Sequence, residues 1–179
     1  MNQYHNYIFL DKINSELSLK IKKIKKVSII YYTDNFESFN EIDCKQIKNF
    51  CKKINAPFYI VNSLKNAVKY NATGVYITAE NRRIILNKYY KLKIIGSVHS
   101  NSDYYFKTIQ NCTLVMLSPL FYNKKYSRNK ILGTVKFRLI SKNWKIDLCP
   151  LGGINNSNLN KIKLLRIGNI AHRSMLKLT

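Results

Sequence analysis

Two adjacent glycines late in the chain have the type and position to bind a phosphate group. Gly152 and Gly153 follow the apolar run 146–151, and an Asn-rich segment that we expect to begin a helix comes directly after them. Glycines at the end of a buried strand let backbone N–H groups approach a phosphate, and a helix N-terminus adds partial positive charge. Because glycine pairs also serve simply to bend a chain, the phosphate site depends on the elements around it.

Eight apolar runs of strand length alternate with helical patterns along the chain. The runs cover residues 7–10, 27–33, 57–61, 74–78, 93–97, 113–118, 145–151 and 168–172. Helical spacing is clearest in Ile47, Phe50, Cys51 and Ile54, and Ser63 is suited to cap the next helix. Near-continuous apolar strands separated by helices are typical of a parallel sheet, and eight units close a barrel. We therefore predict an α/β fold, a compact (β/α)8 TIM barrel with parallel strands, as a single domain over residues 1–179.

The alternative fold is a doubly wound open sheet, because 179 residues is short for a barrel that usually needs about 200. An open sheet of that kind would carry a Gly-rich turn after an early strand, and none follows Leu10 or Thr33. In a barrel, chemistry belongs to residues at the C-terminal ends of the strands. That rule selects Thr33, Asn62, Asn81, Ser97, His99, Ser118, Asn123, Gly152, Gly153 and Ser174.

The charge of the chain is strongly positive, with 31 Lys and Arg against 9 acidic residues and a net charge of +22. Such a balance is typical of proteins that bind nucleic acid, anionic membranes or phosphorylated ligands. Lysine supplies most of it, and Lys, Asn, Ile and Tyr are over-used together, as in AT-rich genomes. The dense lysine run at residues 20–26 alternates with apolar residues at helical spacing, which indicates a solvated helix face. The sequence therefore argues for phosphorylated small molecules and against nucleic acid as the partner.

The four cysteines and the apolar stretches indicate the cellular compartment in which we expect the protein. Cys44, Cys51, Cys112 and Cys149 show no CxxC spacing, so we expect buried reduced thiols and neither a zinc site nor a disulfide framework. No apolar stretch reaches the roughly 18 residues of a membrane span, and the N-terminus has no signal-peptide pattern. We expect a cytoplasmic protein that does not enter membranes. The sequence leaves open whether the chain forms a homo-oligomer.

Several segments, in order along the chain, resemble the thiamine-phosphate synthase family and its thiazole tautomerase relatives. Residues 56–63 (APFYIVNS) with 72–77 (ATGVYI) are similar to the family's PLIINDR…ADGVHLG, and residues 94–100 (IIGSVHS) to IIGxSxHS. Residues 118–121 (SPLF) resemble GPVF, 151–155 (LGGIN) resemble IGGIN, and 170–176 (IAHRSML) resemble VAVVSAI. The order and spacing are specific together, although each motif alone is ordinary.

The resemblance implies a reaction and roles for particular residues. The family joins hydroxymethylpyrimidine diphosphate to a thiazole phosphate with Mg²⁺, releasing diphosphate and forming thiamine phosphate. By resemblance, Gly152, Gly153 and Ser174 would bind the thiazole phosphate. Asn123 with Lys124 or Lys125 would contact the diphosphate, and Arg128 adds charge to the same loop. Ser97 would hydrogen-bond the diphosphate, and His99 matches a histidine that the tautomerase relatives use, so both are candidate catalytic residues.

The chain departs from the family on the pyrimidine side. Tyr31, Thr33 and Asn35 stand where the family has the Gln, Arg and Lys that hold the pyrimidine diphosphate, and Asn62 and Asn81 stand at its two magnesium-binding Asp positions. Hard divalent cations favour carboxylates, so we expect metal affinity to be weakened there. Three hypotheses stay open: a synthase, a tautomerase-type isomerase that uses His99, and a non-catalytic barrel that binds a phosphate ligand.

Overall fold

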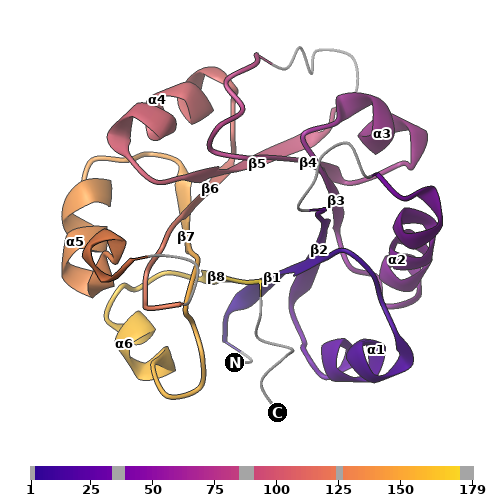
Figure 1. Ribbon diagram of the computed structural model, residues 1–179, viewed down its shortest axis with the longest axis horizontal. Helices are drawn as coiled ribbons and strands as arrows, with labels where there is room; N and C mark the ends of the chain where they lie inside the picture. The colour runs from indigo at the N-terminus through magenta and orange to yellow at the C-terminus, as the bar shows by residue number, and fades with distance from the viewer. Residues whose placement is uncertain (1–2, 34–38, 85–90, 124–126, 174–179) are drawn as a thin grey trace.

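Eight strands form the centre of the molecule and the helices lie outside them (Figure 1). The computed structural model describes residues 3–33, 39–84, 91–123 and 127–173. The strands are β1 (His5–Leu10), β2 (Val27–Tyr31), β3 (Phe58–Val61), β4 (Gly74–Ile77), β5 (Lys93–Val98), β6 (Leu114–Leu117), β7 (Asp147–Pro150) and β8 (Asn169–His172). Each coincides with one of the predicted apolar runs, and no end is shifted by more than two residues.

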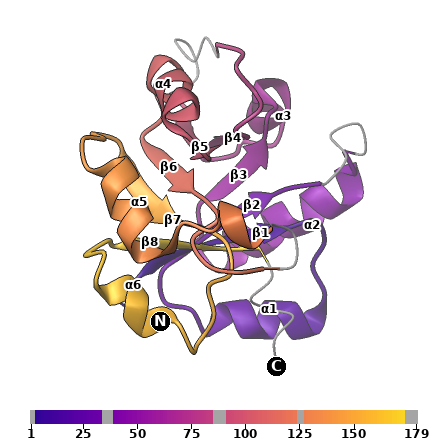
Figure 2. The same cartoon turned by 60° about the vertical axis from the view of Figure 1, so that its left-hand side comes forward.

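Helices connect the strands on the outside of the sheet (Figure 2). They are α1 (Ser15–Lys22), α2 (Glu41–Lys53), α3 (Leu64–Lys69), α4 (Asn101–Ile109), α5 (Gly133–Ser141) and α6 (Leu159–Lys163), with a 3-10 turn η1 (Arg128–Lys130) before α5. Asn14, Asn40, Ser63 and Ser100 each cap the helix that follows with a side-chain oxygen. The connection from β4 to β5 carries no helix in its described residues, 78–84 and 91–92, which differs from the regular alternation that we expected.

The sheet is parallel throughout and nearly closes on itself. Its strand order is β7-β6-β5-β4-β3-β2-β1-β8. Full ladders join neighbours along this order, and a single parallel bridge between Leu151 and Ala171 joins the two ends. This confirms the predicted eight-stranded parallel barrel, with weak closure between β7 and β8.

Alternating residues of the strands fill the barrel interior. The inner cluster holds Tyr7, Phe9, Ile30, Tyr59, Val61, Tyr76, Ile95, Leu114, Met116, Cys149 and Ala171. The larger cluster lies between the strands and the helices and includes Ile29, Ile60, Ile77 and Val115, all fully buried. All four cysteines are buried free thiols, as expected. No helix in the described ranges is long and apolar enough to cross a membrane.

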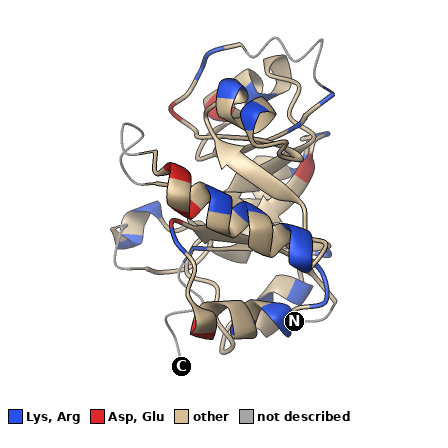
Figure 3. Cartoon of the chain, turned by 90° about the vertical axis from the view of Figure 1, so that its right-hand side faces the viewer, with Lys and Arg blue, Asp and Glu red and all other residues tan. Residues whose placement is uncertain are grey.

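Charges on helices α1, α2 and α4 follow the direction of the helix dipole, with an acidic residue in the first turn and a basic one in the last. Helix α2 begins with Glu41 and Asp43 and ends with Lys52 and Lys53, and Figure 3 shows acidic and basic residues at opposite ends of this central helix. In the lysine-rich run, α1 ends at Lys22, so the predicted helix is shorter than expected, while the lysines from residue 22 to 26 are exposed as predicted. The lysines at the ends of α1 and α2 therefore lie in solvent.

Candidate functional site

The predicted phosphate loop lies at the barrel opening formed by the C-terminal ends of the strands, which we call the mouth. Gly152 and Gly153 both adopt positive φ, 97° and 68°. A Cβ atom on Gly153 would lie 2.5 Å from the carbonyl oxygens of both Phe121 and Tyr122. Only glycine fits this position without moving the neighbouring backbone, because both the left-handed conformation and the contact exclude a side chain.

Backbone hydrogen bonds lock the loop after β7 to the loop after β6. The N–H of Leu120 donates to the carbonyl of Leu151 at 2.9 Å, and the N–H of Phe121 donates to that of Gly152 at 3.0 Å. A Cβ atom on Gly152 would lie 3.4 Å from Nδ2 of Asn123. The fold thus brings the predicted glycines and Asn123 together, whereas Lys124, Lys125 and Ser174 lie outside the described residues.

The segment after the glycines forms a turn, so the expected helix start at this point is wrong. The side chain of Asn158 accepts from the N–H of Asn155 at 2.9 Å and donates to the carbonyl of Gly153 at 2.8 Å, and α6 begins only at Leu159. Within the described ranges, the N–H groups of Gly153 and Ile154 make no hydrogen bond. These two consecutive donors can serve a phosphate, but no helix dipole supports them.

Ser97 points into the barrel and is only 6% exposed. Its hydroxyl hydrogen-bonds the side chain of Tyr76, whose pKa is raised by burial, so this phenol stays protonated and can donate. Tyr76 in turn packs against Phe9, with ring centroids 5.1 Å apart. Ser97 therefore lies in the aromatic layer of the mouth, and its contact with a diphosphate stays a prediction.

His99 is exposed at the mouth and has a defined orientation. Its Nδ1 lies 2.8 Å from the carbonyl oxygen of Ser118, and its backbone N–H donates to the carboxylate of Asp103 at 2.9 Å. A carbonyl oxygen only accepts, so the hydrogen-bond pattern assigns the proton to Nδ1 and makes Nε2 the basic nitrogen of the neutral ring. The ring is thus oriented to exchange a proton through Nε2.

Asn62 and Asn81, at the expected metal positions, use their side chains within the protein. The amide of Asn62 accepts from the N–H of Thr78 at 3.0 Å and donates to the Thr78 hydroxyl at 3.1 Å. The side-chain oxygen of Asn81 accepts from the N–H of Arg83 at 3.0 Å. In the described part of the chain, no group of three or more His, Cys, Asp or Glu could hold a metal ion. These residues do not fit a protein-bound Mg²⁺.

A buried lysine that the sequence did not reveal supports the irregular segment after β4. Lys107 of α4 is fully buried, and its Nζ donates to the carbonyls of Thr78 and Asn81 at 2.8 and 3.0 Å and to the side chain of Gln110 at 2.9 Å. Gly96 leaves room for it, because a Cβ atom there would lie 2.8 Å from Lys107 Cδ. Lys107 thus adds charged hydrogen bonds to two carbonyl groups of a segment that lacks a helix.

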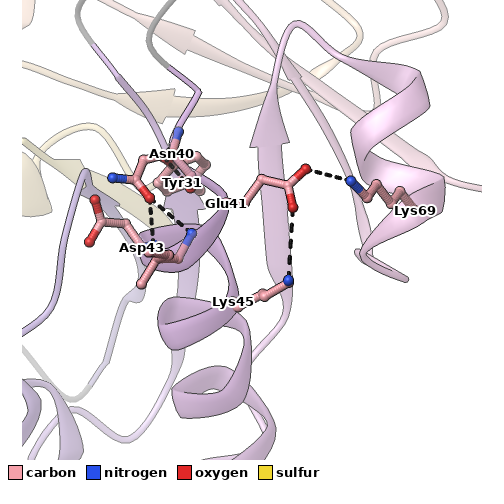
Figure 4. Close-up of polar contacts among 7 residues, drawn as sticks. Tyr31, Asn40, Glu41, Asp43, Lys45 and Lys69 are labelled. Carbon is pink, nitrogen blue, oxygen red and sulfur yellow. Dashed lines mark hydrogen bonds and ion pairs between the residues drawn. The ribbon is translucent and has the colours of Figure 1, made fainter.

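The strand register corrects the comparison of β2 with the family. Tyr31 faces the outer cluster, and its hydroxyl hydrogen-bonds the backbone carbonyl and N–H of Asn40, both at 3.1 Å (Figure 4). Tyr32 packs against the inner cluster instead. The side chain of Tyr31 therefore does not reach the barrel interior. Side chains alternate along a strand, so Ile30 and Tyr32 face inward and Tyr31 faces outward, and this alternation could have been read from the sequence. Asn35 lies outside the described residues.

A second pair of missed residues meets at the mouth. The guanidinium of Arg173, which follows β8, lies 4.2 Å from the ring centroid of Tyr32. Tyr32 also contacts the rings of Phe9 and Tyr76, at centroid distances of 5.8 and 6.3 Å. A cation over an aromatic layer is suited to hold an anion at this opening.

Known structures share the fold of this chain. The thiamine phosphate pyrophosphorylase from Pyrococcus furiosus superposes with a TM-score of 0.73 at 19% identity, covering 97% of this chain and 87% of that one. The corresponding protein from Bacteroides thetaiotaomicron gives a TM-score of 0.61 at 15% identity, covering 96% and 83%. At these identities the likeness shows the barrel fold alone.

Sequence comparison identifies the family. A thiamine-phosphate synthase of Prochlorococcus marinus is 29% identical over 136 residues, 72% of this chain and 38% of that protein. One from Flavobacterium psychrophilum is 30% identical over 138 residues, 70% of this chain and 65% of that protein. The chain thus spans less than two thirds of the length of these relatives. The family profile described as Thiamine monophosphate synthase matches residues 28–176, so the chain belongs to the thiamine monophosphate synthase family.

Proposed function

We propose that this chain binds a thiazole phosphate at the Gly152–Gly153 loop and couples it to hydroxymethylpyrimidine diphosphate, as a cytoplasmic transferase. The proposal is carried by the geometry of Gly153. Its positive φ and its contact with the Phe121 and Tyr122 carbonyls leave no room for a side chain. This contact fixes the loop against its neighbour, and the N–H groups of Gly153 and Ile154 beside it are suited to bind a phosphate. Family membership supplies the substrate class.

The residues of the loop would hold one substrate in place during the reaction. The N–H groups of Gly153 and Ile154 would bind phosphate oxygens, and the amide of Asn123 lies beside Gly152. In the coupling step the C–O bond to diphosphate breaks, diphosphate leaves with the electron pair, and the thiazole nitrogen forms the new C–N bond. Fixing the thiazole orients its nitrogen for this attack, which is an entropic contribution to the rate.

The proposed reaction has no protein-bound metal ion. The family typically depends on Mg²⁺, but Asn62 and Asn81 are neutral and their side-chain oxygens already accept hydrogen bonds. The negative charge of the leaving group must therefore be met by cationic side chains. Arg128 of η1 is exposed on the loop that also carries Asn123, and Lys124 and Lys125 remain proposals outside the described residues.

The test is production of thiamine phosphate from both substrates by the purified protein. We expect turnover by the wild type, a strong loss in Asn123→Ala, and unchanged turnover in Asn129→Ala, a control at an exposed position of the same loop. Absence of product, with both substrates shown to bind by calorimetry, would replace the synthase with a non-catalytic phosphate-binding barrel.

A second candidate, isomerisation of a thiazole phosphate, is favoured by the orientation of His99. Its Nδ1 is held by the carbonyl of Ser118 at 2.8 Å, so Nε2 can take a proton and return it elsewhere on the ring. This chemistry needs only the phosphate loop and no diphosphate site. Proton exchange into the thiazole, followed by NMR, should then occur in a protein without coupling activity and be lost in His99→Gln. Retained exchange in that variant would remove the isomerase candidate.

A further inference from the structure

Arg173 lies where it can act on a ligand at the mouth. It follows β8 directly, and its guanidinium reaches to 4.2 Å from the ring of Tyr32, which follows β2. The rim strand between them is β1, since β1 pairs with both β8 and β2. Arg173 therefore extends along the rim over three adjacent strands, above the aromatic layer that contains Phe9.

The register of the strands places Arg173 level with the phosphate loop. Leu151 and Ala171 are bridged as parallel partners, so Gly153 and Arg173 each stand two residues beyond the bridge. From this level the Arg173 side chain runs away from the glycines toward Tyr32. The mouth thus has two separate groups of donors: backbone N–H groups on the β7 side, and a guanidinium on the β2 side.

The layer below the guanidinium offers hydroxyl groups. Tyr76 is buried beside Tyr32, with ring centroids 6.3 Å apart, and it hydrogen-bonds Ser97. Burial raises the pKa of Tyr76, and the positive charge of Arg173 opposes that rise while Glu80 adds to it, so both charged groups act at this layer. A guanidinium above neutral hydroxyl donors is a combination that favours an anion with several oxygen atoms.

We propose that Arg173, positioned by Tyr32, binds the diphosphate leaving group and takes the place of the metal ion that Asn62 and Asn81 do not support. The proposal deepens the proposed function and rests on it for the identity of the ligand. The planar guanidinium presents paired N–H donors that match two phosphate oxygens, and stacking on Tyr32 orients these donors before the ligand arrives.

The direct test is calorimetric binding of inorganic diphosphate in the presence of EDTA. The variants are Arg173→Gln, which removes the charge, Tyr32→Leu, which removes the stacking ring, and the control Arg138→Gln on the exposed face of α5. We expect wild type and Arg138→Gln to bind alike. Arg173→Gln should bind about tenfold to a hundredfold more weakly, because charged hydrogen bonds are lost, and Tyr32→Leu should fall between them. Circular dichroism checks that each variant is folded.

Inorganic phosphate distinguishes the two groups of donors. Its binding to the glycine loop should be unchanged in Arg173→Gln, and an equal loss for both anions would instead assign Arg173 to the thiazole-phosphate side and overturn the proposal. Diphosphate binding that requires Mg²⁺, or that ignores Arg173→Gln, would also overturn it. If diphosphate binds through Arg173 while no thiamine phosphate forms, the inference stands and the synthase function fails.

Discussion

Replacing Gly153 by alanine tests the geometry of the phosphate loop with a single methyl group. The new Cβ would lie 2.5 Å from two carbonyl oxygens, of Phe121 and Tyr122, on a residue with φ of 68°. The left-handed conformation costs about 1–2 kcal/mol for a residue with a side chain. Pushing the neighbouring backbone away adds about 1–3 kcal/mol, the usual cost of overpacking. We expect Gly153→Ala to lower the free energy of unfolding by about 2–5 kcal/mol in total.

Two other glycines separate these contributions. Gly133 has a similar φ of 61° but no atom within 4 Å of an added Cβ, so Gly133→Ala should show the conformational cost alone. Gly168 also has open space and lacks a positive φ, so Gly168→Ala should be nearly neutral or slightly stabilising. Urea unfolding of the three variants gives the comparison. Equal destabilisation by Gly153→Ala and Gly133→Ala would refute the close contact between the two loops.

Three further predictions concern buried polar groups and the metal positions. Lys107→Met should lower the free energy of unfolding by about 3 kcal/mol, because two carbonyls lose a charged hydrogen bond each. It should also speed tryptic cleavage at Arg82, and an unchanged cleavage rate would contradict the support of this segment. Burial lowers the pKa of His172 to about 4, and its Nδ1 has no partner among the described residues. In the unfolded chain this histidine takes up its proton near pH 6.5. The free energy of unfolding should therefore fall by about 3 kcal/mol between pH 6.5 and pH 4. Equilibrium unfolding of His172→Gln should show a much smaller fall. Asn62→Asp with Asn81→Asp should create Mg²⁺ binding detectable by calorimetry, whereas the wild type should show none; tight binding by the wild type would contradict the metal-free site.

The barrel and the glycine loop could be predicted because they depend on local patterns. Strand-length apolar runs are a property of neighbouring residues, and a glycine pair after such a run marks a tight approach of backbone. The same local patterns do not report on the irregular β4–β5 connection, which Lys107 supports from a position 29 residues beyond Thr78 in the chain. Nothing in the spacing of α4 distinguishes this lysine from a solvated one.

The direction of the side chains at the mouth could not be predicted from the sequence motifs either. Tyr31 and Tyr32 are adjacent in sequence, so the residue that faces the interior depends on the register of β2, which the sequence motif alone did not fix. Arg173 reaches Tyr32 only because β8 and β2 flank β1 in the barrel. The engagement of Asn62 with Thr78 likewise follows from the packing of the loops after β3 and β4.

Binding of thiazole phosphate is the measurement that tests the central claim most directly. We expect calorimetry to show binding of the phosphorylated thiazole by the wild type and by Gly168→Ala. The dephosphorylated thiazole should bind far more weakly, because the backbone donors recognise the phosphate, and Gly153→Ala should weaken binding about tenfold or more through displacement of the loop. Equal binding of the two thiazoles, or full affinity in a folded Gly153→Ala protein, would contradict a phosphate site at Gly152 and Gly153.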